Sequence, residues 1–255
     1  MNKLLQSLIV LCLLIGNASA SEAIPKLNIY MEVWYPFQYT DDQNITRGFA
    51  VDLLDLLLKD LNSTHSKTDF KFAPWARIVL NLKKTNTIAL SMIRTPKRED
   101  RYQWVGPIYS VDNYVIVRKD SLLKKESFTS GNNEITTASI IGDASLHYLE
   151  ELKVNPKNIN VVTNIASPAL MLNKNRVDVI VDNWFNFEEV AKKADLNISD
   201  FKRLINLGGN KTYFAVSRST DPAIALQLQA SLNKIRATTQ YKELLSKYKL
   251  NIKTN

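Results

Sequence analysis

The chain has 255 residues, of which 45% are hydrophobic and 23% charged, with only 7 Gly and 8 Pro. This composition is typical of a globular protein and excludes disordered, collagen-like and low-complexity classes. One Cys and two His exclude a disulfide framework and a Cys/His zinc site. The length fits one large domain or two lobes of roughly 100 residues each. The net charge of +8 allows contact with nucleic acid or a membrane surface but specifies neither.

Residues 1–20 have the pattern of a secretory signal peptide. Lys3 supplies the positive start, residues 8–15 form an unbroken apolar run, and residues 18–20 (Ala-Ser-Ala) form a small-x-small cleavage pattern. The apolar run is too short to span a membrane, which needs about 20 residues. A buried N-terminal helix is the alternative. We expect cleavage after Ala20 and a periplasmic location.

Cleavage would also remove Cys12, the only cysteine. A lipoprotein carries a small residue before its modified Cys, and Leu11 stands there, so a lipid anchor is not expected. The mature chain would have no thiol and a net charge of +7, because Lys3 leaves with the signal. Neither disulfides nor cysteine catalysis are expected in the exported protein.

Strands and helices alternate along the expected mature chain. In its first half, β-forming and apolar runs predict strands at 26–33, 69–72, 88–93 and 114–118, and helices at 49–61 and 75–84. The helix at 49–61 has five leucines on one face, and Asp52, Asp55 and Lys59 on the other.

The pattern restarts after a polar, turn-rich stretch near residues 118–132. Strands are predicted at 135–141, 159–162, 177–181 and 213–217, and helices at 145–152, 167–172, 221–235 and 241–248. Two successive β-α-β-α-β series indicate an α/β fold with mainly parallel sheets, divided into two lobes.

Several short motifs stand in the order of one known family. They are Tyr35-Pro36-Phe37, Gly48-Phe49-Ala50-Val51-Asp52-Leu53, Thr95-Pro96-Lys97-Arg98-Glu99, Arg176-Val177-Asp178, and Thr239-Gln240-Tyr241 with Lys247-Tyr248. In these motifs the chain resembles the bacterial extracellular solute-binding proteins of the polar amino-acid ABC-transporter type (family 3), over nearly the whole mature chain. Residues 74–77 (Pro-Trp-Ala-Arg), 94–100 and 104–108 resemble a branch of that family whose ligand is usually not assigned.

The resemblance implies a periplasmic-binding-protein-like type II fold, with two α/β lobes, a hinge of two crossing strands and a ligand cleft between the lobes. Lobe 1 would cover residues 22–116 and 212–255, and lobe 2 residues 119–210. The hinge strands would be 115–118 and 213–216. The implied function is the capture of a small polar solute, an amino acid or a related molecule, for the membrane permease of an ABC importer. We expect a monomer.

The loops after the strands would surround the cleft, because open α/β sheets bind ligands beyond the carboxyl ends of their strands. Arg98 matches the arginine that holds the ligand carboxylate in the family, and its planar guanidinium suits that task; a surface Arg is the alternative. Ser91 matches a family position that touches the ligand. Ile93 departs from the hydroxyl or small residue common there. Arg94 is an extra cation that, facing inward, would allow a second negative group on the ligand; a solvated Arg94 is the alternative.

Aromatic rings are expected to wall the ligand. Trp34 and Trp75 match family positions with that role, since a ring suits an apolar stem or a cation over its face. Core packing is the alternative for both. Phe37 is expected in the core, and Arg77 remains a possible contact one helical step from Trp75.

Lobe 2 is expected to supply polar groups from two loops. Asp143 or Ser145 would cap a helix whose free N–H groups could bind an anion, or Asp143 could accept an ammonium. Asp182 lies near the family's carboxylate for the α-amino group, and Asn183 competes with it because the register is open by one residue. Ligand bridging Arg98 and Asp182 would then stabilise the closed form.

Two other functions compete with transport. An enzyme resembling cyclohexadienyl dehydratases would need a general acid, for which Glu32 or Asp143 could serve, because His65 and His147 are expected at the surface. A soluble sensor for a membrane receptor is the other. Dispersed basic residues and export disfavour nucleic-acid binding. The sequence has no phosphate loop, nucleophile elbow, His-Glu-x-x-His motif or calcium loop, so we expect no metal and no cofactor.

Overall fold

The computed structural model describes residues 24–128 and 134–250, so the expected signal peptide lies outside the described residues. The strands are β1 (Asn28–Met31), β2 (Tyr39–Thr40), β3 (Thr46–Arg47), β4 (Lys71–Phe72), β5 (Thr87–Ile93), β6 (Tyr102–Arg118), β7 (Thr137–Ile140), β8 (Ile159–Val162), β9 (Val179–Asn183) and β10 (Phe201–Ser217). The α-helices are α2 (Phe49–Asp60), α3 (Trp75–Asn81), α4 (Ser145–Glu151), α5 (Ser167–Asn173), α6 (Trp184–Lys193), α7 (Pro222–Arg236) and α8 (Thr239–Lys247). None of these helices has both the length and the apolar character needed to cross a membrane. The turns η1 (Lys67–Asp69) and η2 (Pro96–Arg101) are 3-10 helices, as are η3 (Lys125–Phe128), η4 (Pro156–Asn158) and η5 (Ile198–Asp200).

Eight strands form one sheet in the order β4-β1-β5-β10-β6-β9-β7-β8. Strands β1, β4 and β5 are parallel at one end, and β7, β8 and β9 are parallel at the other. The long strands β6 and β10 run antiparallel to each other between these ends. The predicted α/β class with mainly parallel strands is therefore confirmed at both ends of the sheet.

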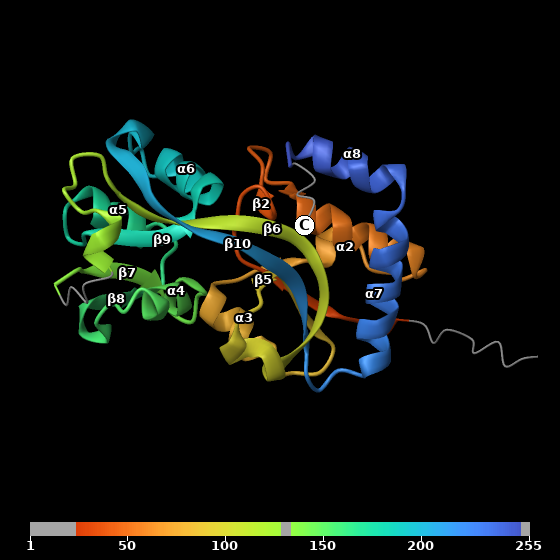
Figure 1. Cartoon of the computed structure of the whole chain (residues 1–255). Coiled ribbons are helices and arrows are strands. Elements are labelled where there is room, and N and C mark those ends of the chain that lie inside the picture. Colours follow the sequence, from red (N-terminus) through yellow and green to blue (C-terminus); the bar gives the residue numbers. More distant parts are fainter. Residues whose placement is uncertain (1–23, 129–133, 251–255) are drawn as a thin grey trace, which may run out of the picture.

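The helices gather around the two ends of the sheet and so form two lobes (Figure 1). In lobe 1, α2, α3, α7 and α8 surround β1, β4 and β5; in lobe 2, α4, α5 and α6 surround β7, β8 and β9. This arrangement is the two-lobed α/β architecture that the sequence predicts.

The two long strands change lobes at a defined place. Residues 113–116 of β6 pair with β9 in lobe 2, whereas residues 212–216 of β10 pair with β5 in lobe 1. The stretches expected as hinge strands, 115–118 and 213–216, therefore lie in β6 and β10 but mostly inside the sheet of a single lobe. A sequence pattern does not contain these non-local pairings.

Residues 110–112 of β6, opposite 209–211 of β10, connect the two sets of pairs. Next to this stretch β10 shifts its register between Asn206 and Gly209, and Gly208 has φ of 87°, which glycine adopts at low cost. We propose that the lobes move about this stretch, and that lobe 1 ends near residue 112 rather than residue 116.

The leucine face of α2 is confirmed as core, since Leu53, Leu54, Leu57 and Leu58 are fully buried. The other face departs from the expectation, because Asp52 and Asp55 are also buried. Lys59 pairs with Asp55 at 2.9 Å, as its spacing of one helical turn allows.

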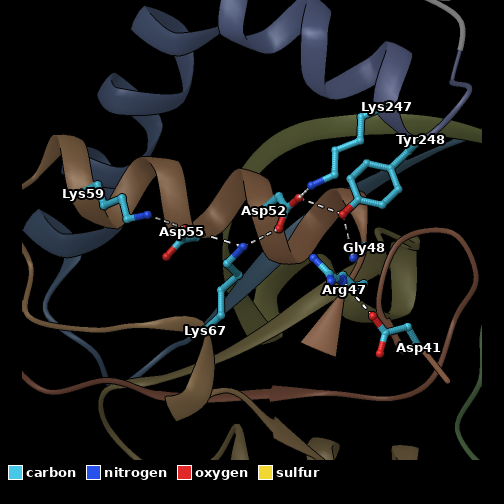
Figure 2. Close-up of polar contacts among 9 residues, drawn as sticks. All are labelled: Asp41, Arg47, Gly48, Asp52, Asp55, Lys59, Lys67, Lys247 and Tyr248. Carbon is cyan, nitrogen blue, oxygen red and sulfur yellow. Dashed lines mark hydrogen bonds and ion pairs between the residues drawn. The ribbon is translucent and has the colours of Figure 1, made fainter. Parts of the chain in front are cut away.

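Figure 2 shows what covers Asp52. Its Oδ1 accepts a hydrogen bond from Lys67 Nζ at 2.8 Å, and its Oδ2 accepts from Lys247 Nζ at 2.6 Å and from the Tyr248 hydroxyl at 2.7 Å. The same hydroxyl accepts the backbone N–H of Gly48 at 3.0 Å. The end of α8 is thereby fixed to the start of α2.

Three other local expectations are corrected. The strand at 114–118 is the end of the much longer β6, and helix α6 was not predicted, although Trp184, Phe187, Val190 and Ala191 follow the helical period. His65 is buried rather than at the surface, and its Nε2 accepts the N–H of Leu27 at 2.7 Å. Phe37 lies in the core, as expected.

Candidate functional site

A cavity lies between the two lobes at the carboxyl ends of β1, β5, β7 and β9. Seven of the eight residues predicted to contact a ligand line it: Trp34, Trp75, Ser91, Arg98, Asp143, Ser145 and Asp182. These residues come together from the ends of five strands, β1, β4, β5, β7 and β9, as expected if ligands bind beyond strand ends.

Arg94, the eighth residue, does not line the cavity. Its guanidinium pairs with Glu99, with Nε to Oε2 at 2.6 Å, and stacks over the rings of Trp104 and Tyr213. The side chain is thus held on the surface of lobe 1 by an acid five residues ahead, and we remove it from the candidate contacts. Arg77 is likewise exposed and outside the cavity.

A distortion of β5 places Ser91 at the cavity. Ser91 has φ of 51°, which is uncommon for a residue with a side chain, and β5 and β10 shift their register beside it. Its hydroxyl donates to Gln38 Oε1 at 2.7 Å, and both residues are buried. Backbone strain of this kind concentrates at functional sites.

Arg98, on η2, lies at the boundary between the lobes. One terminal nitrogen donates to the Ile93 carbonyl of lobe 1 at 2.9 Å, and the other donates to the Gly142 carbonyl of lobe 2 at 2.6 Å. The guanidinium also lies 5.3 Å from the ring centroid of Trp75. Burial lowers the pKa of Arg98 below its ordinary value, while the nearby Asp143 carboxylate favours its charged form.

Trp75 makes a second link between the lobes. Its indole Nε1 donates to the same Gly142 carbonyl at 2.8 Å. At the start of α3, its backbone N–H donates to Glu32 Oε1 at 2.9 Å. Glu32 directly follows β1, so this bond fixes the carboxylate at the wall of the cavity.

The start of α4 carries an acid rather than an open anion site. Asp143 Oδ1 accepts from the Ser145 backbone N–H at 2.8 Å and from the Ser145 hydroxyl at 2.6 Å. The helix boundary residue is Ala144, so neither predicted residue occupies the N-cap position itself. Asp143 therefore occupies the N–H of Ser145, one of the groups that were expected to be open to an anion.

The side chains of Asp182 and Asn183 lie in different surroundings. Asp182 lines the cavity, and its carboxylate accepts two hydrogen bonds from Asn186 Nδ2, at 2.9 and 3.2 Å. Asn183 instead turns to the interior, where it caps α6 by accepting the Asn186 N–H and donates to the Asp112 carbonyl.

Two of the cavity carboxyls have strongly raised pKa values. Burial raises the pKa of Glu32 to about 7, with the Trp75 N–H opposing and Asp143 adding to the rise. Burial also raises the pKa of Asp182 to about 7, with Asn186 opposing and Asp143 again adding to it. Asp143 therefore lies near both acids, one from each lobe.

The prediction of ligand contacts omitted several polar residues of the cavity, namely Glu32, Gln38, Asn113, Tyr148 and Asn186. Glu32 had a usable signal, because it lies next to the carboxyl end of the strand predicted at 26–33. Asn186 did not, because its orientation depends on α6 beginning directly after β9.

Solved structures share this architecture at low sequence identity. A histidine kinase sensor domain with similarity to periplasmic binding proteins has a TM-score of 0.75 at 16% identity, covering 88% of this chain and 96% of that chain. The arginine-, lysine-, histidine-binding protein ArtJ from Geobacillus stearothermophilus has a TM-score of 0.73 at 15% identity, covering 88% and 95%. An ancestral amino-acid-binding protein, a precursor of cyclohexadienyl dehydratase, has a TM-score of 0.65 at 21% identity, covering 86% and 94%. At such identities the likeness shows the fold alone.

The search of curated proteins returned no match. The family model for bacterial extracellular solute-binding proteins, family 3, matches residues 27–251, nearly the whole of the described chain. This chain therefore belongs to the bacterial extracellular solute-binding proteins of family 3.

Proposed function

We propose that this protein is exported to the periplasm, captures a small polar solute between its lobes and delivers it to the membrane permease of an ABC importer. The observation that carries the proposal is the cavity, to which lobe 1 contributes the cation Arg98 and lobe 2 the acid Asp182. A solute that contacts both lobes stabilises the closed form, because those contacts are missing when the lobes separate.

The lobes already meet through groups beside the cavity. Arg98 and Trp75 both donate to Gly142 across the boundary, and Lys97 pairs with Glu150 farther out. A membrane partner that binds only the closed arrangement of these surfaces would therefore distinguish the protein with an occupied cavity from the empty protein. An amino acid or a related molecule fits the proposal, in keeping with the amino-acid-binding proteins of the same fold.

A thermal-shift screen of the purified mature protein tests this proposal. The panel contains amino acids, polyamines and dicarboxylates. A solute present at 100 times its Kd raises the free energy of unfolding by about 2.7 kcal/mol. We expect at least one compound to do so, and to lose its effect in the Arg98→Ala variant. Uptake of that compound by cells with and without the gene then tests delivery to an importer.

An observation in the cavity keeps an enzymatic alternative open. Glu32 has a pKa near 7, the range of a general acid at neutral pH, and lies at the wall of the cavity. A dehydratase would convert prephenate to phenylpyruvate with loss of water and carbon dioxide, so incubation with prephenate and measurement of phenylpyruvate absorbance separates this activity from binding. Turnover that Glu32→Gln abolishes would favour the enzyme over the transport protein.

The sensory alternative has the same ligand chemistry and a different partner. The similar sensor domain shows that this architecture occurs within a histidine kinase. If deletion of the gene leaves uptake of the bound solute unchanged but abolishes a transcriptional response to it, the sensor is favoured.

A further inference from the structure

The cavity is acidic in a chain that is basic overall. Its lining contains three carboxyl groups, those of Glu32, Asp143 and Asp182, and a single permanently charged cation, Arg98. The whole chain, in contrast, has a net charge of +8. One guanidinium can balance only one of the three carboxylates, so the lining has an excess of two negative charges when all three are ionised.

None of the three carboxyls forms an ion pair within the described residues. Glu32 accepts only the Trp75 N–H, and Asp143 accepts only from Ser145. Asp182 accepts from the neutral Asn186 side chain and from the Asn183 N–H. Each of these partners fixes the orientation of a carboxylate without supplying a positive charge.

The acids come from both sides of the cleft. Glu32 follows β1 in lobe 1, whereas in lobe 2 Asp143 follows β7 and Asp182 is the penultimate residue of β9. Asp143 lies near enough to Glu32 and to Asp182 to raise the pKa of each. Closing the lobes therefore brings like charges together unless a proton or a cation comes between them.

Arg98 is already partly engaged. Two of its five N–H donors are used by the backbone carbonyls of Ile93 and Gly142. A zwitterionic solute with one ammonium and one carboxylate adds no net charge and would leave the excess negative charge uncompensated. A carboxylate on the solute is accordingly optional for charge balance, whereas positive charge on the solute balances the lining without protonation of its carboxyls.

We propose that the ligand is an aliphatic molecule with two cationic groups, one held between Glu32 and Asp143 and the other by Asp182 beside Asn186. The connecting methylene chain would lie against the apolar lining, which includes Trp34, Leu90 and Ile140. This inference rests on the proposed function and narrows its solute from polar molecules in general to dications. The dication has two sources, a free diamine and a basic amino acid, which differ in the α-carboxylate.

Matched compounds test each part of the proposal by isothermal titration of the full mature protein at pH 8. Lysine and norleucine differ by the second ammonium, and lysine and cadaverine differ by the carboxylate. We expect lysine or cadaverine to bind at least about 30-fold more tightly than norleucine, glutamine and glutamate, because a charge pair buried in a cleft is lost with the second ammonium. If lysine is favoured over cadaverine, and Arg98→Gln removes that preference, the source is a basic amino acid. If cadaverine binds as tightly as lysine, the source is a diamine.

Variants locate the cationic sites. Glu32→Gln and Asp182→Asn should each weaken the binding of the better dication by about tenfold or more. Glu151→Gln removes a carboxylate from α4 outside the cavity and is the matched control, which should bind as the wild type does. Circular dichroism and a thermal melt of each variant separate loss of binding from loss of folding.

Two results would overturn the inference, and only one of them would also contradict the proposed function. Binding of norleucine, glutamine or glutamate as tightly as either dication overturns the charge argument but leaves solute capture intact. If no compound in the full panel binds, both the inference and the proposed function are wrong.

Discussion

The indole Nε1 of Trp75, in lobe 1, donates a hydrogen bond to the carbonyl oxygen of Gly142, in lobe 2, at 2.8 Å. Arg98 donates to the same oxygen from a neighbouring position in lobe 1. Gly142 has φ of 72°, a conformation that glycine adopts without the steric cost of a Cβ. One backbone carbonyl of lobe 2 thus holds two side chains of lobe 1, and it does so at the edge of the cavity.

Replacing Trp75 by Phe keeps an aromatic ring beside Arg98 and removes the donor to Gly142. A net loss of about 1 kcal/mol for one hydrogen bond shifts the balance between open and closed forms by roughly fivefold. We expect lysine or cadaverine to bind about fivefold more weakly to Trp75→Phe. We also expect a larger radius of gyration without ligand, measured by small-angle X-ray scattering.

Trp104→Phe is the control for this prediction. Its indole donates to the Glu99 carbonyl within lobe 1, so the variant loses a similar bond that does not join the lobes. Equal affinity and equal scattering for Trp75→Phe and the wild type would show that the bond to Gly142 does not hold the lobes together.

Gly48 should not tolerate a side chain. Its φ is 133°, and a Cβ there would lie 2.1 Å from the carbonyl oxygen of Phe37. We expect Gly48→Ala to lower the free energy of unfolding by about 3 kcal/mol, from backbone strain and steric overlap together. Thermal unfolding measures this as a fall in Tm of roughly 10 °C. Gly208→Ala, which has positive φ but no heavy atom within 4 Å of the added Cβ, should lose distinctly less. Equal losses in the two variants would contradict the predicted overlap at Phe37.

The buried Asp52 cluster should fix α8 to the rest of lobe 1 (Figure 2). Burial alone would raise the pKa of Asp52, but hydrogen bonds from Lys247, Lys67 and Tyr248 hold it below its ordinary value. Asp52→Asn removes the ion pair with Lys247 and leaves Lys67 only its 4.0 Å contact with Asp55, and we expect a loss of about 2 kcal/mol in the free energy of unfolding. Compared with the wild type, the Asp52→Asn variant should show a larger increase in amide hydrogen exchange in α8 than in α6, because only α8 is anchored by this cluster.

Asp120→Asn is the matched control, because Asp120 pairs with Arg118 at an exposed position and should contribute little. If Asp52→Asn unfolds at the same denaturant concentration as the wild type, the cluster does not anchor α8.

The features predictable from sequence are those that depend on neighbours in the chain. The leucines of α2 repeat with the helical period, and Arg98 and Asp182 follow strands whose apolar runs are plain in the sequence. The ion pair of Arg94 could also have been predicted, because Glu99 stands only five residues ahead in the sequence.

The features that escaped prediction depend on distant partners. Asp52 is buried by Tyr248, which is 196 residues away along the chain, so the position of Asp52 on the polar face of the predicted helix did not indicate that it is buried. The position of the hinge depends on which strands pair with β6 and β10, and the acidity of the cavity appears only when the ends of three strands meet. Sequence periodicity carries none of this information.

The pKa values of Glu32 and Asp182 predict how stability depends on pH. Both are about 7 in the folded chain, against ordinary values near 4.5 and 3.8, and the other charged or titratable groups that line the cavity are Asp143, Arg98 and Tyr148. Between those values and pH 7, the folded protein holds protons that the unfolded chain has released. The free energy of unfolding therefore falls as the pH rises through this window. We expect the ligand-free protein to lose about 5 kcal/mol between pH 5 and pH 8 from these two groups together, measured by urea unfolding. A Glu32→Gln/Asp182→Asn double variant should lose much less over the same range, because neither replacement titrates.

A bound dication should remove this fall in the free energy of unfolding of the wild type, since it stabilises the ionised carboxylates. The protons that the carboxyls release on binding should give a heat of binding at pH 6 that depends on the buffer. Parallel pH profiles for wild type and double variant would show that neither carboxyl is buried as this structure places it.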